Sequence, residues 1–249
     1  MTNPFIRKLE NFCALNDEER YLIEVLCRHV RRVEARTDIV QQGDEPRCVN
    51  LVLAGWACRY KQFADGRRQI ISLFVPGDLC DPHIFVMRSM DHSLATITPI
   101  SIVRLSEEAI DTITRSPRLQ AALWWDSLVT SAIHREGIVS LGQRSAAERL
   151  AHFFCELSLR LQAVGLGTEA GYELPLTQQD IAEMLGITNV HVNRTLRDMR
   201  DSGLVTLRGR QLTIHDFTAL KRLAIFDPSY LHQGRESVQL DSNVLMRAN

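Results

Sequence analysis

Polar side chains that can recognise DNA bases gather between residues 189 and 197. Asn189, Asn193 and Arg194 are spaced so that a helix would carry them near one another, with Val190 and Arg197 beside them. Asparagine can form two hydrogen bonds to adenine in the major groove, and arginine can form two to guanine. The chemistry that these residues predict is noncovalent recognition of base edges in DNA.

The sequence around these side chains predicts a helix-turn-helix that would place them in a groove. Thr177 and Asp180 have the spacing of a capping box, and Gly186 is suited to end the helix that they begin. Thr188 is the expected N-cap of the second helix. The inward positions of that helix recur at i, i+4 and i+7 and are Val192, Leu196 and Met199. Two capped helices in any bundle show the same pattern, so that alternative stays open at this point.

A short β-hairpin predicted after the second helix argues against an ordinary helical bundle. Residues 204–207 and 211–214 alternate as strands do, and the tip between them is Arg208-Gly209-Arg210. Residues 189–210 contain five arginines and two aspartates, although the whole chain has a net charge of -1. Positive charge confined to the second helix and the hairpin is what a phosphate backbone requires, so we predict a winged helix.

The composition is that of an ordinary globular protein. The 249 residues are 45% hydrophobic, and the length leaves room for two domains. The first residues contain no apolar stretch that would direct secretion, and no segment approaches the roughly 20 apolar residues that cross a bilayer, so we expect a cytoplasmic protein. The six cysteines have no C-x-x-C spacing, and we expect most of them to be buried apolar side chains.

An all-β domain is predicted over residues 39–105. This segment consists of short runs rich in β-branched and aromatic residues, with turn signals such as Asp65-Gly66 every 8 to 12 residues. Before it, residues 17–32 are expected to form a helix that begins with acidic residues and ends with basic ones. The last residues, from Tyr230, look like a loosely held tail.

A long helix is predicted after the β domain, from Ser116-Pro117 to about Gly142. It carries more apolar residues than packing on one domain needs, which favours pairing with the same helix of a second copy; burial in a single-chain core is the alternative. Ser145 and Glu148 then form a second capping box, and a glycine-rich stretch over residues 165–173 is expected to link its helix to the helix-turn-helix.

A β domain, a long helix and a winged helix in this order resemble the Crp/Fnr family, that of the cyclic-AMP receptor protein and the fumarate and nitrate reductase regulator. The similarity extends from about residue 15 to 225 and is strongest in LTQQDIAEMLGITNVHVNRTLRDMRDSGLV. It implies an α+β fold with a β-roll like that of cyclic-nucleotide-binding domains, a dimerisation helix and a winged helix-turn-helix. The implied divisions are 1–115 for the roll and its flanking helices, 116–144 for the long helix, 145–230 for the DNA-binding domain and 231–249 for a tail.

The resemblance also implies roles for single residues at DNA. The base-reading positions are Asn189, Val190, Asn193 and Arg194, and Arg194 stands where the family has a guanine-reading arginine. Many members have glutamate in place of Val190, so a contact with cytosine would be replaced by one with a thymine methyl group. The phosphate-contacting positions are Thr177, Gln179, Thr188, His191 and Arg208, and charge and placement add Arg197 and Arg210.

The sensory half departs from the family's cyclic-nucleotide pattern. Nucleotide binders clamp the cyclic phosphate with an arginine where this chain has His92, and a neutral histidine offers one N–H where arginine offers a fork of donors. Cyclic AMP is therefore not the expected effector. The positions expected to line an effector pocket are Gly77, Asp78, His92, Ser93, His134 and Arg135.

No cofactor is predicted. Cys13 and Cys27 are far apart and have no close companions, so the iron–sulfur cluster of the oxygen-sensing branch is not expected, and neither is a metal site. Haem ligation by Cys80 or His83 is the remaining option. The sequence favours a free thiol and a structural histidine at these positions.

The predicted function is that of a bacterial DNA-binding transcription regulator. No hydrolase, zinc-protease, Walker or dinucleotide motif occurs, so an enzyme is not expected. The expected partners are double-stranded DNA, a second copy of the chain and, from the resemblance, RNA polymerase, with no membrane. The alternative is a redox, haem or small-molecule sensor whose β-roll acts mainly through protein partners. Salt-dependent DNA binding distinguishes the two functions.

Overall fold

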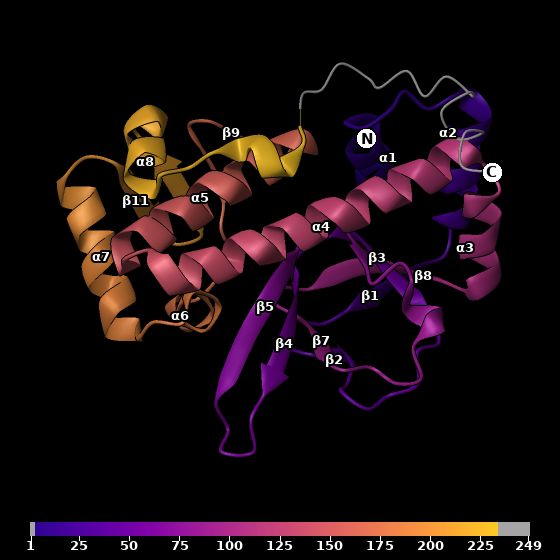
Figure 1. Ribbon diagram of the computed structural model, residues 1–249, viewed down its shortest axis with the longest axis horizontal. Coiled ribbons are helices and arrows are strands. Elements are labelled where there is room, and N and C mark those ends of the chain that lie inside the picture. The colour runs from indigo at the N-terminus through magenta and orange to yellow at the C-terminus, as the bar shows by residue number, and fades with distance from the viewer. Residues whose placement is uncertain (1–2, 234–249) are drawn as a thin grey trace.

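The computed structural model describes residues 3–233 of the chain. It consists of an N-terminal β-roll, a long helix α4 (Pro117–Gln143) that runs across the molecule, and a C-terminal winged domain (Figure 1). The predicted α+β architecture is therefore confirmed.

The roll is built from two four-stranded sheets with the strand orders β1-β8-β3-β6 and β2-β7-β4-β5. Most of its strands lie where alternation and turn signals predict them. The strands are β1 (Val30–Val33), β2 (Asp38–Val40), β3 (Val49–Ala54), β4 (Ala57–Gln62), β5 (Arg68–Phe74), β6 (Leu79–Cys80), β7 (Ser93–Thr96) and β8 (Ile100–Leu105). A 3-10 turn, η1 (Ile84–Val86), follows β6. The Asp65-Gly66 turn closes the β4–β5 hairpin with Gly66 at φ 87, and this hairpin projects away from α4 (Figure 1).

The helix expected over residues 17–32 is shorter than predicted. Helix α2 (Asp17–Leu26) has its capping box at Asn16 and Glu19, but it ends at Leu26. Val30–Val33 then pairs with β8, so Arg31 and Arg32 lie in a strand and not in the last turn of a helix. Pairing with a distant strand outweighed the local preference of a basic segment for a helix C-terminus. A shorter helix, α1 (Pro4–Glu10), precedes α2.

The helices between the two domains begin at the predicted caps. Ser106 caps α3 (Glu107–Thr114), Ser116 caps α4, and Ser145 forms a capping box with Glu148 at the start of α5 (Ala146–Ala163). Each serine side chain accepts a backbone N–H from the first turn of its helix. Strong local signals therefore fix where these helices start.

The winged domain contains more sheet than the sequence predicts. Helices α6 (Gln178–Leu185) and α7 (Asn189–Asp201) are followed by β11 (Val205–Arg208) and β12 (Gln211–Ile214), as predicted. The expected linker over residues 165–173 is instead a pair of strands, β9 (Gly167–Thr168) and β10 (Gly171–Glu173), and β10 pairs with β12. Glycine allows this close pairing, because a Cβ on Gly171 would lie 2.1 Å from the Leu212 carbonyl oxygen.

The chain after the wing folds back on α5. Helix α8 (Phe217–Ala224) and the 3-10 turn η2 (Pro228–Leu231) pack there, with Leu231 buried and the Tyr230 hydroxyl donating to Glu156 at 2.8 Å. The prediction of a loose tail is therefore wrong at Tyr230 and Leu231. The rest of that predicted tail, residues 234–249, lies outside the described residues.

The roll and the winged domain share one hydrophobic core. Side chains from β4 and β5, including Cys58 and Ile70, belong to the same buried cluster as Phe154 of α5 and Ile181 of α6. The two domains are therefore packed against each other in this structure, and a change in their arrangement would expose apolar surface.

Candidate functional site

The helix-turn-helix is held by the caps that the sequence predicts. Thr177 Oγ1 accepts the Asp180 backbone N–H at 3.1 Å, and Asp180 Oδ2 accepts the Thr177 N–H at 2.8 Å. Gly186 ends α6 in the left-handed region, at φ 62. Thr188 Oγ1 accepts the His191 N–H at the start of α7. These bonds satisfy backbone donors at the start of each helix and fix the angle between α6 and α7.

The outer face of α7 carries all four predicted base-reading side chains. Asn189, Val190, Asn193 and Arg194 are exposed, and Val190 is 74% exposed. Asn189 Nδ2 donates to Gln179 Oε1 at 2.5 Å, and Asn193 Nδ2 donates to the Asn189 carbonyl at 3.1 Å. The inward residues Val192 and Met199 are buried, so α7 presents one face to its domain and the other to solvent.

The predicted phosphate-contacting residues surround this face. All of them are exposed: Thr177, Gln179, Thr188 and His191 at the first turns of α6 and α7, Arg197 further along α7, and Arg208 and Arg210 beside the wing tip at Gly209. Backbone N–H groups at helix starts and arginine side chains are the donors that phosphate oxygens accept. The arrangement fits two helix starts and a basic wing lying against one DNA backbone.

A groove of about 860 Å³ separates this surface from the roll. Asn193, Arg197 and Arg210 line one side, and Arg36 of the loop between β1 and β2 lines the other. Arg200 also lines the groove, although it was not among the predicted DNA-contacting residues. The sequence could have indicated this position, because Arg200 stands three residues after Arg197 and so lies on the same face of the helix.

The first helix of the pair is tied to the roll by a bidentate ion pair. The Arg36 guanidinium donates to both carboxylate oxygens of Asp180 at 2.6 and 2.7 Å. Although burial opposes ionisation, hydrogen bonds from Arg36 and Thr177 lower the pKa of Asp180 below its ordinary value. The carboxylate that caps α6 therefore also binds the β-roll.

Helix α4 leaves a stripe of large apolar side chains in solvent. Trp124 is 56% exposed, Leu128 62% and Ile138 70%, and Val139 and Leu141 are also exposed. The His83 ring stacks on Trp124 with centroids 4.8 Å apart, so the region after β6 extends this surface. Several large apolar side chains exposed along one helix are a feature that is common at protein interfaces.

A cleft of about 370 Å³ lies between the roll and α4, and an arginine occupies its centre. Arg59 of β4 is buried; its guanidinium binds Asp81, and its Nε donates to His92 Nε2 at 3.3 Å. Its third nitrogen lies 3.4 Å from His134 Nε2 on α4. His92 Nε2 also lies 3.0 Å from Asp81 Oδ2. The donors of Arg59 are thus directed at side chains of the protein itself.

Only two of the six residues predicted for the effector pocket lie at this cleft. His92 and His134 face it, whereas Ser93 accepts a hydrogen bond from the backbone of Gln42 and Arg135 is exposed on α4. Gly77 and Asp78 turn toward α1 and α5, where Asp78 forms ion pairs. The contact between Arg59 and Asp81 could not be predicted from the sequence, because it depends on how β4 and the segment after β6 come together.

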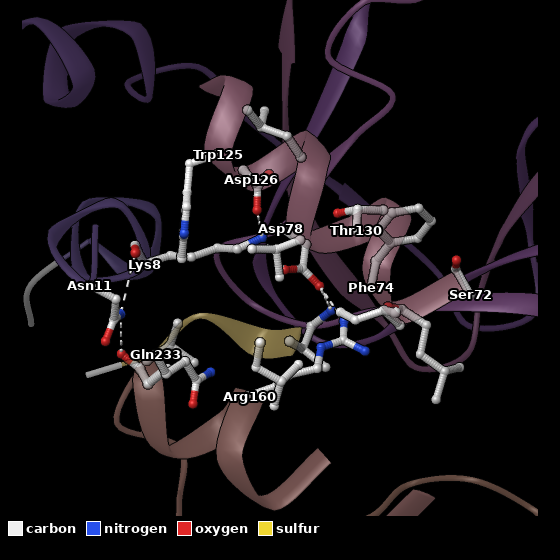
Figure 2. Close-up of a pocket in the computed structure, with 18 of the residues that line it drawn as sticks. Lys8, Asn11, Ser72, Phe74, Asp78, Trp125, Asp126, Thr130, Arg160 and Gln233 are labelled. Atoms are coloured by element: carbon white, nitrogen blue, oxygen red, sulfur yellow. Dashed lines mark hydrogen bonds and ion pairs between the residues drawn. The ribbon is translucent and has the colours of Figure 1, made fainter. Parts of the chain in front are cut away.

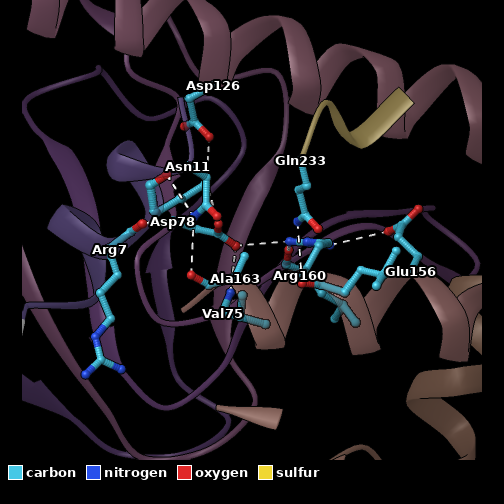
Figure 3. A network of polar contacts seen from close by, with 12 residues as sticks. Arg7, Asn11, Val75, Asp78, Asp126, Glu156, Arg160, Ala163 and Gln233 are labelled. Carbon is cyan, nitrogen blue, oxygen red and sulfur yellow. Dashed lines mark hydrogen bonds and ion pairs between the residues drawn. The ribbon is translucent and has the colours of Figure 1, made fainter. Parts of the chain in front are cut away.

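Asp78 belongs instead to a buried ionic network that joins four parts of the chain. Figure 2 shows the Lys8 amine of α1 beside Asp78 and Asp126 of α4, at 2.7 and 2.5 Å. Arg160 of α5 reaches Asp78 at 3.0 Å and Glu156 at 3.5 Å (Figure 3). Although burial opposes its charge, Asp126 and Asp78 raise the pKa of Lys8 above the usual range. Burial raises the pKa of Asp126.

The cysteines do not form a metal site in the part of the chain that the structure describes. No three His, Cys, Asp or Glu side chains among residues 3–233 are arranged to hold a metal ion. Burial raises the pKa of the Cys80 thiol well above its ordinary value, and a thiol that stays protonated is a poor haem ligand. The ring of His83, the other residue considered for haem, is stacked on Trp124.

Comparison with known proteins matches both domains. A family model described as a cyclic nucleotide-binding domain matches residues 30–116, and one described as a Crp-like helix-turn-helix domain matches residues 148–223. The chain is 29% identical over 188 residues to the nitrogen fixation regulation protein FixK of Azorhizobium caulinodans, covering 73% of this chain and 74% of that protein. It is 26% identical over 211 residues to the regulatory protein HlyX of Actinobacillus pleuropneumoniae, covering 81% and 84%.

The solved structure of FixK2 from Bradyrhizobium japonicum has the same fold. It superposes with a TM-score of 0.70 at 23% identity, covering 78% of this chain and 96% of that one. No helix within residues 3–233 has the length and apolar character needed to span a membrane.

Proposed function

Because this chain belongs to the Crp/Fnr family of DNA-binding transcription regulators, whose members are not enzymes, we propose that it binds a pseudo-palindromic promoter site as a homodimer. The exposed α4 stripe carries this proposal, because pairing two copies through it would bury Trp124, Leu128 and Ile138. A two-fold pair presents two recognition helices to half-sites about 34 Å apart, one turn of DNA. RNA polymerase is the partner we propose at the promoter, in the bacterial cytoplasm.

Within each half-site we assign base recognition to the outer face of α7. Arg194 reads a guanine, Val190 contacts a thymine methyl group, and Asn189 and Asn193 supply amide donors and acceptors. The helix starts and the wing bind phosphates and set the register.

We also propose that cyclic AMP is not the effector and that no haem or iron–sulfur cluster is required. The arrangement of Arg59, whose donors are directed at Asp81, His92 and His134, supports the proposal about cyclic AMP. A cyclic phosphate would have to displace those partners to be bound by Arg59. A signal that did act at this cleft would reach α4 through His134 and alter how the two long helices pack.

Binding measurements on Arg194→Ala and Arg208→Ala test the assignment. A preferred site is first selected from random DNA, and affinities for that site and for single-base variants are then measured at several salt concentrations. We expect Arg194→Ala to cost about 1 to 3 kcal/mol and to relax discrimination at one base pair, and Arg208→Ala to weaken binding to all sequences alike. The absence of DNA binding at low salt would refute the proposed function, and equal effects of both variants on every sequence would refute the role of Arg194.

A further inference from the structure

A second cavity lies inside the β-roll and is lined by roll residues alone. Its volume is about 360 Å³, within the range of small-molecule sites. Ile39, Val40 and Leu94 of one sheet form an apolar wall, and polar residues of β3 and β8 in the other sheet face them. We call this space the roll cavity. It is distinct from the cleft at α4, although Asp81 lines both.

A buried side chain without a partner lies in the wall of the roll cavity. Asn50 is 3% exposed, and its Oδ1 accepts no hydrogen bond from the residues that the structure describes. In the sheet, Asn50 stands opposite Cys80 on one side and Arg104 on the other, so the three side chains share one face. Buried amide oxygens in native proteins are nearly always paired. The natural partner for Asn50 is an N–H or O–H donor inside the cavity.

Three arginines and three carboxylates line the roll cavity, and two of the arginines have no carboxylate partner among the described residues. Arg31 and Arg104 line the cavity, and neither forms an ion pair within residues 3–233; Arg104 Nε donates only to the Cys48 thiol, at 2.9 Å. Arg31 and Arg104 project from the same face, because Arg31 pairs with Ile102, two residues from Arg104. Two guanidinium groups supply donors that suit a carboxylate or a phosphate, and the Asn50 Oδ1 in the same wall is an acceptor for an O–H or N–H.

The carboxylates that line the roll cavity already have hydrogen-bond or ion-pair partners. Asp44 accepts the backbone N–H of Gln41 at 2.8 Å, and Glu45 lies 3.6 Å from Arg47 at the exposed rim. Asp81 is held by Arg59 and His92, as described above. Glu45 and Asp81 are therefore paired with arginines and Asp44 with a backbone N–H, whereas Arg31 and Arg104 have no carboxylate partner within residues 3–233.

We propose that the roll cavity binds a small organic anion that carries a hydroxyl or amino group. Arg104 and Arg31 would hold its carboxylate or phosphate, and Asn50 Oδ1 would accept its O–H or N–H. The shared residue Asp81 gives such a ligand a connection to α4, through Arg59 and His134. The inference concerns the roll alone and does not depend on the proposed DNA-binding function.

The test measures ligand binding by the full-length chain in the absence of DNA. The probes are L-malate, L-glutamate and 3-phosphoglycerate, which combine an anionic group with a hydroxyl or amino donor; acetate and sulfate serve as anions without one. Binding is followed by calorimetric titration and by the rise in melting temperature that a ligand of the folded state produces. We expect at least one probe to bind and to raise the melting temperature more than acetate or sulfate does.

Variants distinguish ligand binding at the roll cavity from a general effect of salt on stability. Asn50→Leu keeps the volume of the side chain and removes the unpaired amide. We therefore expect the melting temperature of this variant without ligand to equal or exceed that of the native chain. The rise in melting temperature on adding ligand should be lost. Arg104→Gln should weaken binding about tenfold or more. Arg32→Gln, a neighbouring exposed arginine that does not line the cavity, should bind normally. Failure of all three probes to bind, or equal responses in Asn50→Leu and the native chain, would overturn the proposal.

Discussion

At the scale of single residues, Val190 is the exposed residue whose substitution we expect to change the preferred DNA sequence. It lies in the first turn of α7, among the predicted base-reading side chains, and is 74% exposed. A valine can contact a thymine methyl group but cannot accept a hydrogen bond, so at the proposed base-reading position Val190 would contribute an apolar contact and no hydrogen bond.

We expect Val190→Glu to shift the preferred half-site toward cytosine at one position. A glutamate there accepts a hydrogen bond from the exocyclic amine of cytosine, a difference of about 1 to 3 kcal/mol between bases. Selection from random DNA with the native chain and the variant measures the shift. Val190→Ala is the control, because it removes the methyl contacts without adding an acceptor. An unchanged preference in Val190→Glu would contradict the placement of this residue at a base.

The DNA-facing residues could be predicted because their signals are local. Thr177, Gly186 and Thr188 each act within one helical turn, so the caps and the outward face of α7 follow from the sequence. Arg59 and Asp81 could not be predicted in the same way. They are 22 residues apart in the chain and meet only through the packing of the roll, and Asp81 adopts a left-handed backbone at φ 58 that few residues favour.

At the scale of secondary structure, helix α4 has one face that packs on the roll and another that is exposed to solvent. Its inner face, with Leu119, Ala122 and Leu123, packs on the roll, and its outer face carries the apolar stripe. The excess of apolar residues is visible in the sequence, whereas the orientation of each face follows only from the three-dimensional arrangement.

We expect Leu128→Glu to convert a dimer into a monomer. The substitution places two carboxylates near each other at a two-fold interface and removes buried apolar area. Sedimentation analysis of the purified chain measures the change. Leu166→Glu is the matched control, since Leu166 is a 48% exposed leucine that is not part of α4. A Leu128→Glu variant with the native mass would show that the stripe is not the interface.

Helix α5 contains a histidine whose protonation opposes folding. Burial, together with the guanidinium of Arg144, lowers the pKa of His152 from 6.5 to about 4. The unfolded chain therefore takes up this proton at a higher pH than the folded chain does, so its contribution to stability is full above pH 6.5 and falls as the pH decreases toward 4. A shift of this size corresponds to about 3 kcal/mol.

The melting temperature should therefore decrease between pH 6.5 and 4.5, and His152→Gln should reduce this decrease by about 5 to 10 °C. The comparison uses the slope with pH, because the substitution also removes the contacts of the ring with Phe226 and Tyr230. His29→Gln is the control at an exposed site. Parallel pH profiles for the native chain and His152→Gln would contradict the predicted role.

At the scale of the whole molecule, ion pairs between elements hold the two domains in one arrangement. Arg36 binds the cap of α6, and the network of Lys8, Asp78, Asp126 and Arg160 joins α1, the roll, α4 and α5. These ion pairs join residues that are far apart in the chain, so the packing of the two domains could not be predicted from the sequence. The sequence predicts two domains and a linker, whereas the structure shows a shared core in which β9 and β10 complete the sheet of the wing.

A double-mutant cycle on Arg36→Gln and Asp180→Asn measures the bond between the domains. We expect a coupling energy of about 1 to 3 kcal/mol in thermal unfolding, because the pair is bidentate and Asp180 is buried. Asp180→Asn should cost more than Arg36→Gln, since it also weakens the cap of α6. The exposed pair Arg67 and Asp65 gives a matched cycle, expected below about 1 kcal/mol. Equal coupling in the two cycles would show that Arg36 does not hold the winged domain.

If two copies pair through the exposed apolar side chains of α4, as proposed, the concentration of this protein becomes a quantity to which a promoter can respond. When pairing is incomplete, the amount of dimer rises with the square of the monomer concentration, so doubling synthesis gives about four times as many DNA-competent molecules. Production and degradation of the chain would then act as signals in their own right, and a regulator of this kind could respond to gene dosage while the roll stays unchanged.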